Sequence, residues 1–436
     1  MVSSTTAIIL ITYLFVLSST SQTGGFLSPK RRIATEQKKS TKMNESQSSL
    51  FSPNSKYHHN QNGLAKRRRW LIVDFDGTCT EHDTTPLLPR LAAFATRSRS
   101  SISKASDGTE TNNNDDYDHQ EDLKKRLDQF QLLEDEFMKR YNEARSKMFN
   151  GENDESSTSL YDVLDALDEP SNAVTEMVSA SKCLSGLGHA DTNEVEGMLN
   201  LQGVTRETTL ENTNISENHS DVKVTVKLRH GCESTLSRIL LDDKASLSKD
   251  DCEKDDHKCY GWRLAVLSIN WSPKLIDACL VQPVLRRRRS LLRIESCDTE
   301  VPIWSNEVDR EGVVTLRVPG ALAKRDRLIE LKKYIKQGCD QTQSIIVYVG
   351  DSSTDLAALL VADMGIVMGN SSSLITIAES WGIEIAPLKN RHEHEFQRLL
   401  STDANEEPPG KTILYQTDTW QEIDEALQEI DEHWIS

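Results

Sequence analysis

The 436-residue sequence predicts an α/β protein with a parallel sheet and helices on both of its faces. Two apolar runs, 71–73 and 344–350, are rich in β-branched residues and have the composition of buried strands. Between 263 and 430, strand-like and helix-like segments alternate, which is typical of parallel strands joined by helices. Segment 121–149 repeats apolar residues at helical spacing. A mainly helical insertion therefore follows the first strand.

The N-terminal 69 residues differ in composition from the rest. Segment 7–18 is an apolar block of signal-peptide length, so 1–22 is predicted to be a signal peptide, with an uncleaved membrane anchor as the alternative. Segment 23–69 is rich in Ser, Asn, Lys and Arg, which fits a transit-like segment or a disordered basic linker. The chain is thus expected to enter the secretory pathway, bound for a plastid through a bipartite presequence, for secretion or for membrane anchoring. No stable membrane span is expected after signal removal.

The remainder of the chain is strongly acidic. The whole sequence has a net charge of −17, and because its first 69 residues contribute +9, the rest carries −26. This charge argues against nucleic acid as a partner, and a phosphate-bearing ligand would need local cations. Cys252, His257 and Cys259 suggest a zinc cluster, but no fourth ligand is evident, so an exposed acidic loop is favoured. The sequence leaves the oligomeric state open.

The first predicted strand ends in a group of acidic residues. Asp74 and Asp76 follow it two positions apart, so in an extended chain their side chains share a face, and Gly77 allows a sharp turn behind them. Such neighbours repel unless a cation lies between them or one is protonated, and both arrangements suit catalysis. A long interval follows, in which 97–120 is expected to be disordered and 205–222 to form another loop. Within this interval, separate helical patterns occupy 160–167 and 173–184.

The second half of the chain predicts the remaining strands of the sheet. Strand-like runs precede helical patterns in the order 263–269, 274–281, 344–350, 354–362, 364–369, 383–387, 412–416 and 420–430. Ligands of parallel sheets bind beyond the carboxyl ends of the strands. Asp74, Ser268 and Asp351 all fall at such ends and are expected to meet there.

Four separated motifs carry a family resemblance. They are "DFDGT" at 74–78, "VLSIN" with Ser268, "ALAKRDR" with Lys324, and "VGDSSTDL" with Asp351 and Asp355. In this order they resemble the haloacid dehalogenase-like (HAD) hydrolase superfamily. The resemblance implies a HAD-like Rossmannoid parallel sheet with helices on both faces and a mainly helical cap inserted after the first strand. The implied domains are 70–88 for the first core strand, 89–259 for a cap with disordered insertions, and 260–436 for the rest of the core.

The motifs point to phosphoryl transfer onto a carboxylate. Asp74 would be the nucleophile and form an aspartyl-phosphate. Asp76 would protonate the leaving alkoxide and then activate water, which requires a pKa raised by its carboxylate neighbour. Mg²⁺ would be held by Asp74, the Asp76 carbonyl oxygen and Asp351. The alternative is that these aspartates only form turns after strands.

A second group of residues is predicted to bind the phosphate. Ser268, Lys324 and Thr78 would contact its oxygens, and Asp355 would orient the lysine. The alternatives are local ones: Ser268 as a strand-end cap, Lys324 as a solvated helix residue, and Asp355 as a helix-start residue. Only the resemblance selects this lysine among its neighbours.

Some phrases resemble one branch of the superfamily. "CTEHDT", "NWSPKLI" and the run 371–374 are similar to the HAD phosphatase part of plant bifunctional proteins that join it to a thiaminase-II-like domain. In that family this part is a thiamin monophosphate phosphatase, so thiamin monophosphate is the first candidate substrate. Phosphoserine, a sugar phosphate or a non-catalytic binding role are alternatives. Asp83 could face a cationic thiazolium ring or cap the next helix.

Overall fold

A computed structural model describes residues 68–106, 114–149, 159–202, 224–241, 261–293, 300–337, 344–391 and 413–435. The predicted signal peptide, most of the basic segment 23–69, the loop 205–222 and the motif with Cys252 and Cys259 lie outside the described residues. Among the described residues, none of the helices combines the length and apolar composition that a bilayer span requires.

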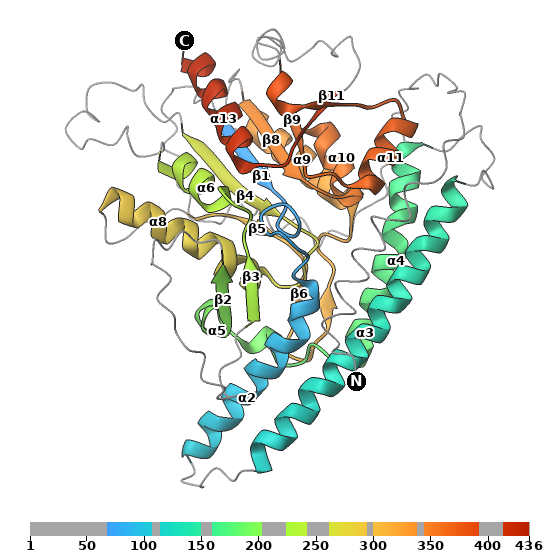
Figure 1. Cartoon of the computed structure of the whole chain (residues 1–436), viewed down its shortest axis with the longest axis vertical. Coiled ribbons are helices and arrows are strands. Elements are labelled where there is room, and N and C mark those ends of the chain that lie inside the picture. Colours follow the sequence, from blue (N-terminus) through green and yellow to red (C-terminus); the bar gives the residue numbers. More distant parts are fainter. Residues whose placement is uncertain are drawn as a thin grey trace, which may run out of the picture. The chain divides into compact units, whose positions relative to one another are not determined.

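Seven parallel strands form the central sheet, in the order β10-β11-β9-β8-β1-β4-β5 (Figure 1). The first strand along the chain, β1, lies between β8 and β4. The predicted α/β class with a parallel sheet is therefore confirmed. The strand bounds are β1 Arg68–Val73, β4 Trp262–Leu267, β5 Ile303–Trp304, β8 Ser344–Gly350, β9 Met364–Met368, β10 Glu384–Pro387 and β11 Ile413–Thr417.

Both faces of the sheet are covered because alternate residues of its strands bury opposite sides. In β1, Leu71 and Val73 belong to one apolar cluster, whereas Trp70 and Ile72 belong to the other. One cluster includes residues of α6 (Cys232–Leu241), α8 (Gln282–Leu292) and α13 (Trp420–Ile435). The opposite cluster includes residues of α9 (Ala321–Gln337), α10 (Leu356–Val361) and α11 (Ser372–Ser380).

The insertion after β1 is mainly helical, as predicted. Its elements are α2 (Leu88–Ser106), α3 (Asn114–Phe149), α4 (Leu160–Ser181), α5 (Thr192–Met198) and a short parallel pair, β2 (Leu199–Gln202) and β3 (Val224–Lys227). Helix α3 packs along α2 and along α4 (Figure 1). The expectation of disorder over 97–120 is wrong for 97–106 and 114–120, which extend two of these helices. We call α2 to β3 the cap.

One helix replaces the two that were predicted at 160–167 and 173–184. Helix α4 continues through Pro170, which lacks the N–H for a helical hydrogen bond. The buried face of α4 includes Leu164, Leu167, Val174 and Val178. Burial of such side chains stabilises a helix by about 1.5–3 kcal/mol each, which offsets an interior proline at about 3 kcal/mol. Tertiary packing thus overrides the local breaker.

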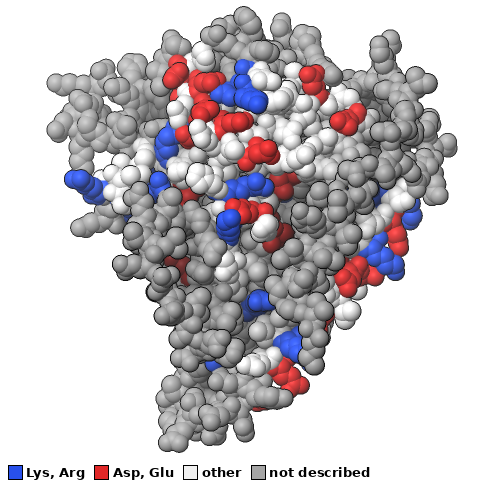
Figure 2. Space-filling view, viewed as in Figure 1, with Lys and Arg blue, Asp and Glu red and all other residues white. Residues whose placement is uncertain are grey.

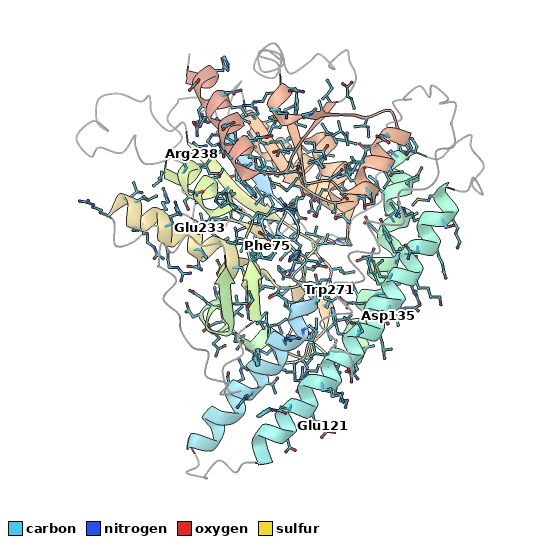
Figure 3. All side chains as sticks on the ribbon, in the orientation of Figure 1. Phe75, Glu121, Asp135, Glu233, Arg238 and Trp271 are labelled. Atoms are coloured by element: carbon cyan, nitrogen blue, oxygen red, sulfur yellow. The ribbon has the colours of Figure 1, made fainter. Side chains whose placement is uncertain are left out.

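Helix α6 falls within the range predicted as cap, 89–259, but it packs on the core. It contacts α8, α13 and β4. Arg238 of α6, labelled in Figure 3, donates from Nε to Asp424 Oδ1 of α13 at 2.8 Å. The chain therefore returns to the core before β4 begins.

The segments after β4 include a continuous helical stretch and a small hairpin. The helix predicted at 274–281 begins as α7 (Pro273–Ile276), passes through a π-helical turn at Asp277–Val281 and continues as α8. A small antiparallel hairpin, β6 (Glu307–Val308) with β7 (Val314–Thr315), lies between β5 and α9.

Candidate active site

Asp74 stands at the carboxyl end of β1, an interior strand of the sheet. It follows β1 directly, its backbone N–H donates to Val349 O of β8 at 2.9 Å, and its side chain is 5% exposed. Asp351 follows the end of β8, and Ser268 follows the end of β4. Because these strands are parallel neighbours, the three residues come together at one edge of the sheet.

Lys324 reaches this edge from the first turn of α9. Its ammonium Nζ lies 2.6 Å from Asp355 Oδ1 and 3.2 Å from Asp74 Oδ1, and its side chain is fully buried. Burial lowers the pKa of Lys324, but the charges and hydrogen bonds of Asp355 and Asp74 outweigh burial and hold the pKa above its ordinary value. The amine is therefore a permanent positive charge beside Asp74.

Asp355 is held by hydrogen bonds at both carboxylate oxygens. Its Oδ1 accepts from Lys324 Nζ and from the hydroxyl of Tyr348, each at 2.6 Å. Its Oδ2 accepts from the backbone N–H groups of Asp351 and Ser352 and from the Ser352 hydroxyl, at 2.9–3.2 Å. These contacts fix the carboxylate in one orientation and leave it little capacity for a metal ion.

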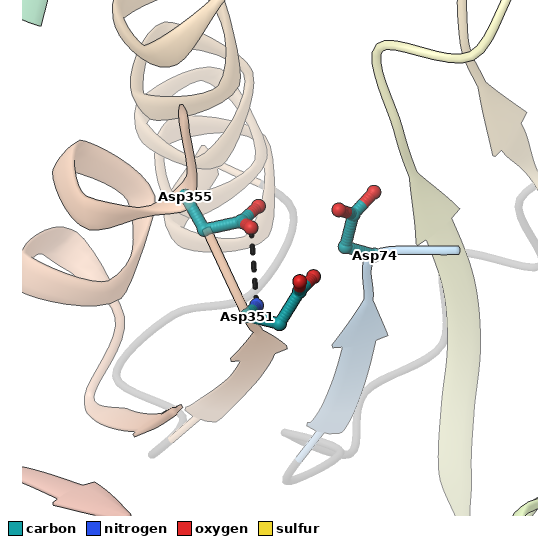
Figure 4. A group of neighbouring side chains, drawn as sticks. All are labelled: Asp74, Asp351 and Asp355. Atoms are coloured by element: carbon teal, nitrogen blue, oxygen red, sulfur yellow. Dashed lines mark hydrogen bonds between the residues drawn. The ribbon is translucent and has the colours of Figure 1, made fainter. Parts of the chain in front are cut away.

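Three aspartates form an acidic group that could hold a cation (Figure 4). Ligand oxygens of Asp74, Asp351 and Asp355 lie within 4.8 Å of one another. Because Asp355 is already occupied, Asp74 and Asp351 are the available ligands. Thr78 Oγ1 donates to Asp351 Oδ1 at 2.8 Å and orients that carboxylate.

The electrostatics of this group favour a bound divalent cation. Burial, followed by the charge of Asp355, raises the pKa of Asp74 to about 7 against the effect of Lys324. Burial and the charges of Asp355 and Asp74 likewise raise the pKa of Asp351. Among the described residues, no donor is aligned to hydrogen-bond the buried Asp74 Oδ1. Three aspartates share one ammonium here, so the group keeps excess negative charge, and hard oxygen ligands of this kind fit Mg²⁺.

Asp76 lies on the other side of the site, toward the cap. Its Oδ1 accepts from Thr84 N at 2.8 Å and from Thr84 Oγ1 at 2.6 Å, and its Oδ2 accepts from Asn270 Nδ2 at 2.7 Å. Burial, followed by the charge of Asp83, raises the pKa of Asp76 to about 7, and the charge of Asp74 contributes less to this rise. The predicted direction of this shift agrees with the structure, but burial is the main cause.

Gly77 allows the turn that brings the first motif against Asp351. Its φ is +72°, and a Cβ at this position would lie 2.2 Å from Asp351 Oδ2. Arg229 Nε donates to Gly77 O at 2.7 Å and holds the turn from the segment that ends the insertion. Any side chain at residue 77 would therefore displace a candidate metal ligand.

Of the remaining predicted site residues, Ser268 and Thr78 contact the aspartates of the site, whereas Asp83 lies on the surface. Ser268 is fully buried, and its hydroxyl hydrogen-bonds Asp74, which lowers the pKa of that carboxyl. Thr78 is engaged with Asp351, as described above. Asp83 is exposed, and its Oδ1 accepts from Thr85 N at 2.8 Å. This last contact satisfies the first N–H of the short helix Thr85–Leu87, although the N-cap position of that helix is Thr84 and makes no side-chain capping hydrogen bond.

Sequence reasoning missed Asn270 and Thr84. Asn270 is 1% exposed and donates from Nδ2 to both Asp76 Oδ2 and Thr84 Oγ1, the latter at 3.1 Å. Its position two residues after Ser268 was an available signal, because such residues share a face of an extended chain. The next residue, Trp271, which is labelled in Figure 3, packs edge-on against Phe130 of α3, with ring centroids 6.4 Å apart. The cap therefore contacts the core directly beside Asp76.

The chain resembles HAD-like phosphatases in its parallel α/β fold and in the order of its four motifs, as the sequence predicted. No family model matches the chain. A CTO1 family protein of Schizosaccharomyces pombe is 24% identical over 164 residues, which cover 37% of this chain and 55% of the relative. The bifunctional TH2 protein, mitochondrial, of Arabidopsis thaliana is 27% identical over 129 residues, 28% of this chain and 21% of that protein. The chain thus spans about half of the first relative's length and about a fifth of the second's.

Solved structures with detectable similarity include phosphatases and hydrolases. A substrate-bound phosphoserine phosphatase complex matches 72% of this chain and 91% of its own, with 12% identity and a TM-score of 0.30. A protein of unknown function from Bordetella pertussis matches 73% and 97%, with 13% identity and a TM-score of 0.30. A HAD family hydrolase from Salmonella enterica matches 72% and 66%, with 12% identity and a TM-score of 0.24.

Proposed function

We propose that this chain is a Mg²⁺-dependent phosphomonoesterase that acts through an aspartyl-phosphate on Asp74. One observation carries the proposal: a buried, fully charged Lys324 lies 3.2 Å from Asp74 at the carboxyl end of β1. A buried ammonium beside a candidate nucleophile suits a substrate whose anionic oxygens contact the amine while the carboxylate attacks. A purely structural ion pair would not require the further acidic residue Asp351 to face the same space.

In the first step, a carboxylate oxygen of Asp74 attacks phosphorus and the bond to the alcohol oxygen breaks. Protonated Asp76, whose pKa is near 7, gives its proton to the departing alkoxide. Lys324 and the Ser268 hydroxyl would bind the equatorial phosphate oxygens. When bound, Mg²⁺ on Asp74 and Asp351 would offset negative charge on the phosphate and keep the nucleophile ionised.

In the second step, water hydrolyses the aspartyl-phosphate. Ionised Asp76 takes a proton from this water as the water attacks phosphorus, and Asp74 leaves as a carboxylate. Thr84 and Asn270 donate hydrogen bonds to Asp76 and lower its pKa, which stabilises the ionised form needed here. Asp76 can thus serve both steps with one pKa close to neutrality.

For the substrate, we propose a small phosphoester, with thiamin monophosphate as the first candidate. The similarity of "CTEHDT" and "NWSPKLI" to thiamin monophosphate phosphatases supports this choice. A second support is the acidic character of the cap side: burial and then the charge of Asp83 raise the pKa of Glu134 on α3 to about 7. A phosphoester whose alcohol part carries a cationic ring, such as a thiazolium, would be favoured near Asp83 and Glu134.

The direct test is phosphate release by the purified chain with Mg²⁺ from a panel that includes thiamin monophosphate, phosphoserine and sugar phosphates, with kcat/KM as the criterion. Asp74→Asn should lower phosphate release by at least ~10³-fold, because the amide cannot form the acyl phosphate. Equal activity of the wild type and this variant would sink the aspartyl-phosphate mechanism. A preference for phosphoserine or a sugar phosphate would replace the substrate but keep the mechanism.

The proposed partners and location follow from the sequence. We expect small-molecule phosphoesters rather than nucleic acid; on the face seen in Figure 2, described acidic and basic side chains are intermixed. The N-terminal segments favour the secretory pathway, with a plastid as one destination, although the Arabidopsis relative is named as mitochondrial. Imaging a fluorescent fusion of residues 1–69 distinguishes these compartments.

A further inference from the structure

The cap helix α4 contacts the core helix that carries Lys324. Asp168 of α4 is 6% exposed, and its Oδ2 accepts a hydrogen bond at 2.6 Å from the backbone N–H of Ala321, the first residue of α9. Leu164 and Leu167 of α4 belong to the same apolar cluster as Leu328 of α9. The acceptor therefore comes from the cap and the donor from the core.

Helix α9 has no capping side chain of its own. The preceding residue is Gly320, and a Cβ there would lie 2.0–2.4 Å from the carboxylate atoms of Asp168. The first N–H groups of a helix lack partners within it and usually bond a side chain of the residue just before the helix. Here the Asp168 carboxylate occupies that space and performs that role. When the carboxylate is ionised, its negative charge also suits the positive end of the helix dipole.

Lys324 lies in the turn that Asp168 caps. Its backbone N–H donates to Gly320 O at 3.1 Å, so the lysine is one helical turn from the capped end. From this position its Nζ reaches both Asp355 and Asp74. A displacement of about 1 Å at a reacting group can cost ~10²-fold in rate. The order of this first turn therefore bears directly on catalysis.

We infer that Asp168 is a positioning residue that holds the first turn of α9, and with it the Lys324 ammonium, from the cap. Its catalytic consequence rests on the proposed phosphatase function. The same carboxylate lines a cavity of about 60 Å³ together with Ile269 and Thr354, the neighbours of Ser268 and Asp355. A ligand that shifts α4 would thus act on α9 through this hydrogen bond.

The test compares Asp168→Ala with Glu169→Ala, an exposed neighbour on the same helix, in the full chain. Acetic anhydride labels lysine amines, and mass spectrometry measures acetylation of Lys324 relative to Lys332 and Lys333 of the same helix. Labelling of the buried Lys324 should rise about fivefold or more in Asp168→Ala, because the first turn opens locally. With p-nitrophenyl phosphate, kcat should fall about tenfold or more. Glu169→Ala should match the wild type in both measurements.

A rescue variant separates positioning from general damage. Gly320→Ser alone should impair the protein, because its Cβ collides with Asp168. In the Asp168→Ala background the space is free, and the new hydroxyl can cap α9 from its own chain position. The double variant should therefore recover most of the lost kcat and lower Lys324 labelling, while Asp168→Asn, which keeps an acceptor oxygen, should stay within about threefold of the wild type.

Two results would overturn the inference. One is unchanged Lys324 labelling in a folded Asp168→Ala, judged by circular dichroism; the other is raised labelling with unchanged kcat. If Asp168→Ala does not fold, Gly320→Ala pushes the same carboxylate away and must raise labelling instead. A wild type that hydrolyses no phosphoester would refute the proposed function, whereas labelling would still decide whether Asp168 holds Lys324.

Discussion

The two sides of the site differ in how their charges are balanced. On the phosphate side, Lys324, Asp355 and Asp74 are at most 5% exposed and form ion pairs with one another. On the cap side, Asp83 is exposed and Glu134 is half-buried, and no ion pair joins either to a lysine or arginine within the described ranges. On the first side the ammonium is already paired with carboxylates before substrate arrives, whereas the second side leaves negative charge that a substrate could balance. We therefore expect changes on the phosphate side to affect rate and changes on the cap side to affect selectivity.

Removal of divalent cations should have the largest effect on phosphate release and should act on the phosphate side. Without a cation, Asp74 has a pKa of about 7 and is partly protonated at neutral pH. Chelation with EDTA should reduce phosphate release by at least ~10³-fold, and added Mg²⁺ should restore it. Full activity in EDTA after dialysis would show that Lys324 alone supports the reaction.

Replacement of Lys324 should follow in size. Lys324→Ala removes the buried cation and leaves Asp355 with an unpaired charge, so kcat should fall ~10²–10³-fold. Lys332→Ala is the matched control, because Lys332 lies on the same helix and pairs with Asp363 on a half-buried surface. Steady-state kinetics on both variants measures the difference. Similar losses in both would indicate that helix stability, not the ammonium, is responsible.

Loss of Asn270 should change the pH profile. Its Nδ2 lowers the pKa of Asp76, so Asn270→Ala should move the limb that reports Asp76 to higher pH and reduce kcat by about tenfold. Profiles of kcat against pH for the wild type and the variant provide the measurement. A limb that moves to lower pH would contradict the assignment of this limb to Asp76.

Stability without metal should decrease as pH rises. The pKa values of Asp74, Asp76 and Asp168 are about 7 when folded, against 3.8 as the ordinary value. The folded state therefore holds extra protons between these values, and their stabilising contribution is present below pH 3.8 and lost as pH rises through 7. The melting temperature in EDTA should fall between pH 5 and pH 8 by about 2–4 °C per kcal/mol lost. Mg²⁺ should reverse part of this fall at pH 8; a rise in melting temperature over this interval would contradict the burial argument.

The smallest effect is expected on the cap side. Asp83→Asn should raise KM for thiamin monophosphate about two- to fivefold, the size of an exposed charge interaction. KM for p-nitrophenyl phosphate, whose alcohol part is uncharged, should stay nearly unchanged. The ratio of the two KM values isolates the charge effect. An equal change for both substrates would indicate that Asp83 acts only through its hydrogen bond to the backbone N–H of Thr85 and does not contact the substrate.

The two sides also differ in what the sequence reveals. Strands β1 and β8 each contain a continuous apolar run, and the ends of these runs place Asp74 and Asp351 without knowledge of the rest of the fold. Asn270 and Asp168 act on partners 194 and 153 residues away, and no local pattern encodes such contacts. Pro170 shows the same limit, since its helix depends on packing against the core. Local physics therefore predicts the strand ends that carry the proposed catalytic residues, and tertiary contacts determine what supports them.

The capping of α9 by Asp168 has a consequence for exchanging one cap with another. A hydrolase core could in principle accept a foreign insertion after β1 and gain a new specificity. In this chain such a graft would also remove the acceptor for Ala321, because Gly320 cannot supply one. A successful chimera must therefore bring a carboxylate at the equivalent place or carry serine at 320. The insertion thus supplies the cap of a core helix, and recombination at the boundaries of the insertion would destabilise that helix.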